Sequence, residues 1–86
     1  MTGIDWSREE DIGADRIRVP LDGKSSAAWD REFLAITGRM CDEVGRGLYK
    51  VVLVEEDGVW IHVAIVAGSR AAAVESLDAA AAAANT

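Results

Sequence analysis

The stretch LYKVVLVEEDGVWIHVAIVA, residues 48–67, decides the fold of this 86-residue chain. It predicts two strands, over residues 48–56 and 59–67, joined at Asp57-Gly58, the dipeptide that type I′ hairpin turns prefer. One face of this hairpin is wholly β-branched and predicts the core side: Val52, Val54, Val59, Ile61, Val63 and Ile65. The other face is unusually apolar for a solvated sheet face, and it carries Tyr49, Val51, Leu53 and Glu55 beside Trp60, His62, Ala64 and Val66.

A further strand is predicted N-terminal to the hairpin, because apolar and polar side chains alternate over residues 16–21. Pro20 near its end is typical of an edge strand or a strand terminus, and Asp22-Gly23 then turns the chain. This strand presents Ile17, Val19 and Leu21 on one face and Arg16, Arg18 and Pro20 on the other.

Two helices complete the expected elements. The first has Ser25 or Ser26 as its N-cap and ends at Gly45 or Gly47. Its apolar stripe recurs every three or four residues and consists of Trp29, Phe33, Ile36, Met40 and Val44, with Leu34 and Cys41 at the flank and Gly38 on the solvent side. The second runs from an N-cap at Ser69 to about residue 84, and Asn85 ends it. Its inward stripe is Val74, Leu77 and Ala81, while Glu75 and Asp78 point outward.

These elements predict one α+β domain over residues 16–86 in the order β-α-β-β-α. We expect a three-stranded antiparallel sheet with strand order 1-3-2 and both helices on one face, which is a truncated ferredoxin-like arrangement without its final strand. The handedness of crossover connections favours this order over a consecutive 1-2-3 meander. The strand over residues 16–21 then forms an unpaired edge. The uncovered face carries the candidate interface or ligand-binding residues Arg16, Arg18, Tyr49, Val51, Leu53, Trp60 and His62.

Residues 1–15 form an acidic N-terminal arm, with Asp5, Glu9, Glu10, Asp11 and Asp15 against Arg8 alone. A mobile arm is one interpretation. The other is an acidic hook that docks on a basic partner or on the domain itself. Trp6 favours docking, because an indole usually finds something to cover it.

The overall charge of −6, from nine basic and fifteen acidic residues, argues against a nucleic-acid partner, since phosphate neutralisation needs the opposite sign. No segment approaches the roughly 20 apolar residues of a membrane span, and the N-terminus lacks the pattern of a signal peptide. We therefore expect a cytoplasmic protein with no membrane partner and with its single cysteine, Cys41, reduced.

No residue pattern in the chain indicates catalysis. His62 is the only histidine, and the expected sheet separates it from Cys41, so neither a nucleophile–base pair nor a zinc site is expected. We predict no cofactor and no metal. Arg16 and Arg18 are expected to pair with acidic residues of the arm or of a dimer mate.

The apolar open face and the unpaired edge together predict a homodimer, by sheet-to-sheet packing or by edge-to-edge pairing. The leading hypothesis is a non-enzymatic interaction module in a regulatory or inhibitor role, whose partner is a protein, basic in charge. The alternative is a small-molecule-binding domain that uses the open face as a pocket floor. An enzyme ranks third.

The motif Ile17-Arg18-Val19-Pro20-Leu21, the pair Trp29 and Phe33, the strand pair and the closing Ala-rich helix resemble short proteins of high-GC bacteria with the same element order and no established activity. That resemblance covers residues 16–85. Residues 49–84 also resemble antitoxins of the HicB type, although this chain lacks the further strand and the Pro-Gly-Cys turn that those proteins place before the helix.

Overall fold

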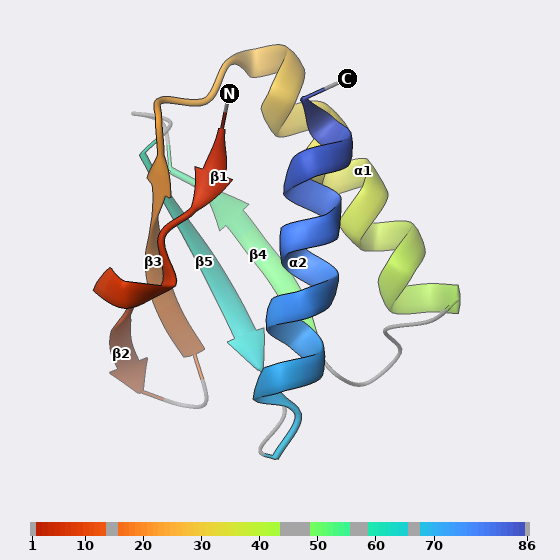
Figure 1. Ribbon diagram of the computed structural model, residues 1–86. Coiled ribbons are helices and arrows are strands. Elements are labelled where there is room, and N and C mark those ends of the chain that lie inside the picture. Colours follow the sequence, from red (N-terminus) through yellow and green to blue (C-terminus); the bar gives the residue numbers. More distant parts are fainter. Residues whose placement is uncertain (1, 14–15, 44–48, 56–58, 66–67, 86) are drawn as a thin grey trace.

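The computed structural model describes residues 2–13, 16–43, 49–55, 59–65 and 68–85, without the side chains of residues 40–43 and 49–53 (Figure 1). In chain order the elements are β1 (Gly3–Ile4), the 3₁₀ turn η1 (Trp6–Arg8), β2 (Glu10–Gly13), β3 (Arg16–Asp22), α1 (Ala27–Glu43), β4 (Tyr49–Val54), β5 (Trp60–Ile65) and α2 (Arg70–Ala84). The predicted hairpin turn at Asp57-Gly58 and the predicted helix end at Gly45 or Gly47 lie outside the described residues.

The sheet confirms the predicted α+β class and strand order. Both β3 and β4 pair antiparallel with β5, so the order β3-β5-β4 is the expected 1-3-2. The helix α1 connects β3 to β4 across that intervening strand, and both helices lie on the same side of the sheet (Figure 1). The core forms between the two helices and the face of the sheet that they cover.

The expectation that residues 16–21 form an unpaired edge is wrong. On the outer side of β3, both β1 and β2 pair with it antiparallel, Ile4 opposite Leu21 and Glu10 opposite Arg18. The sheet thus has two short strands more than the three expected, and they lie where the final strand of a complete ferredoxin-like fold would lie. The backbone N–H of Asp5 also donates to the Pro20 carbonyl at 2.9 Å.

The helix α1 forms as its apolar spacing predicts. Ser26 caps it, because its Oγ accepts from the backbone N–H of Trp29 at 3.1 Å. Trp29 and Phe33 are buried and stacked, with ring centroids 4.7 Å apart, and Ile36 packs against the same core. Thr37, which the apolar spacing does not predict to be in the core, is buried beside them, and its hydroxyl donates to the Phe33 carbonyl at 2.8 Å.

The helix α2 packs through smaller side chains than predicted. Leu77 and Ala81 are buried as expected, whereas Val74 is only half-buried and the stripe is completed by Ala73 and Ala80. In a helix so rich in alanine, large side chains do not mark the inward face. Ser69 occupies the N-cap position without a side-chain hydrogen bond, and Asn85 is the C-cap. Over the described residues, neither helix combines the length and the apolar character that a membrane crossing needs.

Candidate functional site

The face of the sheet opposite the helices, called the open face below, gathers the predicted site residues of β3 and β5. Arg18 lies directly opposite His62, and Pro20 lies opposite Trp60. Directly opposed residues of an antiparallel pair point to the same face, so these side chains share the open face. On the outer side Glu10 of β2 also lies opposite Arg18. A row of side chains therefore runs from Glu10 through Arg18 to His62.

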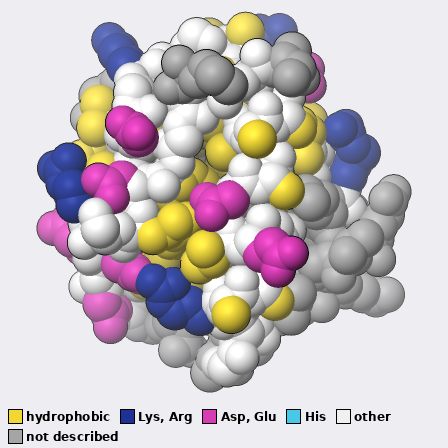
Figure 2. Space-filling model, viewed as in Figure 1, with side chains coloured by type: hydrophobic (Ala, Val, Ile, Leu, Met, Phe, Trp, Pro, Cys, Tyr) yellow, Lys and Arg dark blue, Asp and Glu magenta, His cyan; other side chains and the backbone are white. Residues whose placement is uncertain are grey.

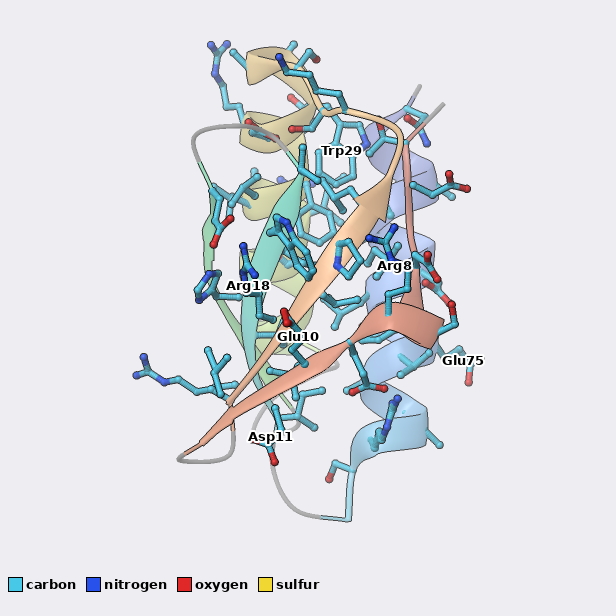
Figure 3. All side chains as sticks on the ribbon, turned by 90° about the vertical axis from the view of Figure 1, so that its left-hand side faces the viewer. Arg8, Glu10, Asp11, Arg18, Trp29 and Glu75 are labelled. Carbon is cyan, nitrogen blue, oxygen red and sulfur yellow. The ribbon has the colours of Figure 1, made fainter. Side chains whose placement is uncertain are left out.

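Arg18 is the centre of this row and is held by every nitrogen of its guanidinium. Its Nε and Nη2 donate to the two carboxylate oxygens of Glu55 at 3.1 and 3.2 Å, and its Nη1 donates to Glu10 at 3.2 Å. The same guanidinium lies 3.8 Å from the centroid of the Trp60 ring. Figure 3 shows Arg18 and Glu10 on this side of the sheet. Such a planar, bidentate arrangement fixes the side chain more firmly than a single contact.

Glu55 joins the row from the end of β4. Its backbone N–H donates to the Trp60 carbonyl at 2.8 Å, which holds the residue beside β5. Its carboxylate lies 2.8 Å from His62 Nε2 as well as against Arg18. The side chains of Arg18, Glu55 and His62 are each between 24% and 30% exposed, so the network is partly screened from water.

The contacts in this network shift two pKa values. Hydrogen bonds from Arg18, and then from His62, lower the pKa of Glu55 below its ordinary 4.5, against a smaller opposing effect of burial. The hydrogen bond to Glu55 is the largest cause that raises the pKa of Arg18. Both groups are therefore charged throughout the neutral range, and the Arg18–Glu55 pair is permanently ionised there.

The lowered pKa of Glu55 predicts a pH-dependent contribution to stability. A carboxyl whose folded-state pKa is depressed contributes stability above its unfolded-state pKa and loses it as the pH falls through the folded value. We expect Glu55→Gln to lower the melting temperature at pH 7 and to have progressively less effect as the pH falls below 4.5, because the folded wild-type carboxyl takes up its proton only below that ordinary value. Thermal melts followed by circular dichroism over that range measure this. Glu75→Gln, an exposed position on α2, is the control; equal losses at pH 7 for both variants would contradict the prediction.

The structure brings together Arg16, Arg18, Trp60 and His62 of the predicted site. Tyr49, Val51 and Leu53 belong to β4, and their side chains lie outside the described part of the chain. Their backbones pair with Ile65, Val63 and His62 respectively, and a register shift lies between Val51 and Leu53. The regular alternation on which their common face was predicted is interrupted at that shift.

Two residues of the network were not among the predicted site residues. Glu55 follows the alternation of its strand, and the sequence therefore predicts that it lies on the same face as Trp60. Glu10 was assigned to the arm, and a four-residue strand of exposed side chains gives no periodic signal. The expectation that Arg18 pairs with an acidic residue of the arm is confirmed by its bond to Glu10.

The acidic segment docks on its own domain at three points along α2. Trp6 Nε1 donates to Asp78 at 2.8 Å, Glu9 forms an ion pair with Arg70, and Asn85 exchanges two hydrogen bonds with the Thr2 backbone. Figure 2 shows hydrophobic side chains in the seam between this segment and α2, bordered by acidic ones. The docking interpretation of residues 2–13 is therefore the one the structure supports.

The chemistry available on the open face is that of ion pairing and stacking. The Glu55–His62 contact resembles half of a catalytic arrangement, but within the described residues no nucleophilic side chain is hydrogen-bonded to the ring of His62. The same described part holds no group of three or more potential metal ligands. Comparison with protein-family models, curated proteins and solved structures finds no match to this chain.

Proposed function

We propose that this protein is a non-enzymatic interaction module that forms a homodimer by packing the open faces of two copies together. The observation that carries the proposal is Trp60, a large side chain that remains half-buried on the face of the sheet opposite both helices. Its opposite neighbour Pro20 is fully buried. An aromatic side chain left in this position is covered at low cost by a second protein surface.

The neighbourhood of Trp60 has the composition of an interface hot spot. Tryptophan and arginine are the residues most enriched at such positions. Here the guanidinium of Arg18 is stacked on Trp60 and fixed by Glu10 and Glu55 before any partner arrives. Association therefore orders few additional side chains, which lowers its entropic cost.

A second copy is the occupant that the charges favour. A two-fold interface places one patch against itself, so the patch must be self-complementary. Among the described residues of the open face, Arg16 is exposed, whereas Arg18 is shared between two carboxylates. A two-fold rotation would set the exposed Arg16 of each copy against Glu10 or Glu55 of the other copy. Each arginine would then gain an acidic partner across the interface. Because β1 and β2 pair along the outer edge of β3, the proposal commits to sheet-to-sheet packing.

Sedimentation equilibrium at micromolar concentration tests this proposal, with an expected mass of twice the 9.2 kDa chain. Trp60→Ser is expected to weaken the dimer by about tenfold or more, the effect of losing a hot-spot side chain. The matched control is Leu34→Ser, which removes an apolar side chain that is 40% exposed on α1, away from the open face, and should leave the dimer intact.

Arg16→Glu provides a second variant that does not threaten folding, because Arg16 is exposed. We expect this charge reversal to weaken the dimer as well, and increasingly so at low salt. A wild-type protein that sediments as a 9.2 kDa monomer at every concentration contradicts the proposal. So does a dimer that Leu34→Ser disrupts while Trp60→Ser and Arg16→Glu leave it unchanged.

A further inference from the structure

His62 is the only histidine of the chain, and it lies on the open face within β5. Its side chain is 24% exposed, and its Nε2 lies 2.8 Å from the carboxylate of Glu55. Histidine is the side chain that ordinarily changes its charge between pH 5 and 8. The face that packs against a second copy in the proposed dimer therefore carries one group whose charge depends on pH near neutrality.

The other charges around His62 keep their sign over this range. Arginine and lysine stay protonated, and carboxylates ordinarily stay ionised above about pH 5. Both helices lie on the opposite side of the sheet, so their charged side chains do not face the ring (Figure 1). The charged residues on the strand pairs nearest to His62 are Arg16 and Arg18 of β3, Glu10 of β2, Lys50 of β4, whose side chain lies outside the described part of the chain, and Glu55 at the end of β4.

A proton on His62 unbalances these charges. With the ring neutral, the described side chains of this set are two arginines and two carboxylates, which cancel. Glu55 already accepts two hydrogen bonds from Arg18, so its charge is balanced before the ring gains one. A charged ring thus adds one surplus positive charge to each open face. A two-fold interface sets these two surplus charges on facing surfaces, where like charges weaken association.

Burial of the ring acts in the same direction. A second copy over the open face removes water from the part of His62 that is still exposed. Exclusion of water disfavours the charged form of an imidazole relative to the neutral form. Association therefore favours the neutral ring, and by thermodynamic reciprocity a proton on the ring favours the separated copies.

We propose that His62 is a pH sensor of the open-face dimer, and that protonation of its ring between pH 7 and 5.5 drives the two copies apart. This inference rests on the proposed function, because only a dimer offers an association that the proton can oppose. Arg18 and Glu55 stay ionised over this range, so the ion pair within each chain is kept while the dimer loosens.

Sedimentation equilibrium of the full chain at pH 7 and at pH 5.5, with equal ionic strength, tests the sensor. We expect the dissociation constant of the dimer to be about tenfold higher at pH 5.5, the effect of one pair of like charges partly screened by water. The difference should shrink in about 0.5 M sodium chloride, because salt screens such a pair. Circular dichroism at both pH values checks that the chain is folded.

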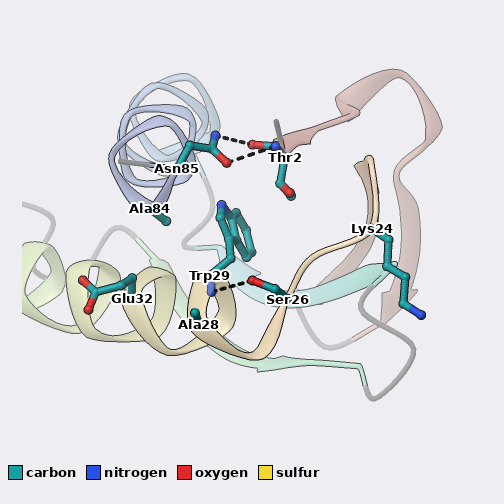
Figure 4. Close-up of a pocket in the computed structure, with 8 residues that line it drawn as sticks. All are labelled: Thr2, Lys24, Ser26, Ala28, Trp29, Glu32, Ala84 and Asn85. Atoms are coloured by element: carbon teal, nitrogen blue, oxygen red, sulfur yellow. Dashed lines mark hydrogen bonds between the residues drawn. The ribbon is translucent and has the colours of Figure 1, made fainter.

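Two variants assign the effect to the histidine. His62→Gln removes the titrating ring but keeps a donor for Glu55, so its dissociation constant should be the same at both pH values. The matched control is Glu32→Gln, which should keep the wild-type response. Glu32 is an exposed carboxyl on α1, beside a pocket of about 300 Å³ between the first turn of that helix and the end of α2 (Figure 4).

The outcomes separate this inference from the proposed function. A wild-type dimer of equal strength at both pH values would overturn the sensor and leave the dimer standing. So would a His62→Gln dimer that weakens at pH 5.5 as much as the wild type does. A wild-type chain that is monomeric at pH 7 at every concentration would refute the dimer and the sensor together.

Discussion

Replacing Phe33 by Ala is expected to lower the free energy of unfolding by about 3–5 kcal/mol, the usual cost of removing a buried aromatic ring. Phe33 is fully buried, and its ring is stacked on that of Trp29. An 86-residue protein has a total stability of only about 4–13 kcal/mol, so this variant loses a large share of it. Urea unfolding followed by circular dichroism measures the difference.

The adjacent residue provides the control for that variant. Leu34 lies on the same helix but is 40% exposed, and Leu34→Ala should cost less than about 1 kcal/mol. Phe33→Leu keeps most of the buried volume and should cost about 1–2 kcal/mol, so an effect remains measurable if Phe33→Ala does not fold. Similar losses in the free energy of unfolding for Phe33→Ala and Leu34→Ala would show that α1 does not bury the face that carries Trp29 and Phe33.

The main elements were predictable because their side chains repeat at the period of the structure. Trp29, Phe33 and Ile36 recur at helical spacing, and residues 16–21 alternate as a strand does. The handedness of the crossover then left one order for the three long strands. Arg18, Trp60 and His62 could be assigned to one face for the same reason, since alternation and pairing together place them there.

Other features carried no such periodic signal. The β1 strand has two residues and β2 has four, all four of them exposed, so neither shows an alternating pattern. Their pairing is decided by contacts distant in sequence, such as those between Thr2 and Asn85. The register shift in β4 lies within an uninterrupted apolar run, which has no residue to mark it. In α2, alanines on every side hide which of them are buried.

Deleting the docked N-terminal segment is the second change that we expect to lower the free energy of unfolding strongly. Deleting residues 2–13 removes Ile4 and Trp6, which pack against the core, and exposes the backbone of β3. From the apolar surface that these two half-buried side chains cover, we expect a loss of about 2–4 kcal/mol in the free energy of unfolding. If the segment did not dock, its deletion would leave the free energy of unfolding unchanged. Urea unfolding of the deletion variant therefore distinguishes a docked segment from an undocked one.

Two matched point variants test the same segment without shortening the chain. Ile4→Ser removes an apolar side chain that packs against the core, whereas Ile12→Ser removes one that is 46% exposed in β2. The first should cost about 1–2 kcal/mol and the second less than about 0.5 kcal/mol. The deletion variant should also aggregate more readily, because an exposed strand edge pairs with other chains. Equal stability for Ile4→Ser and Ile12→Ser, with a deletion variant as stable as the full chain, would mean that β1 and β2 contribute nothing to the folded state.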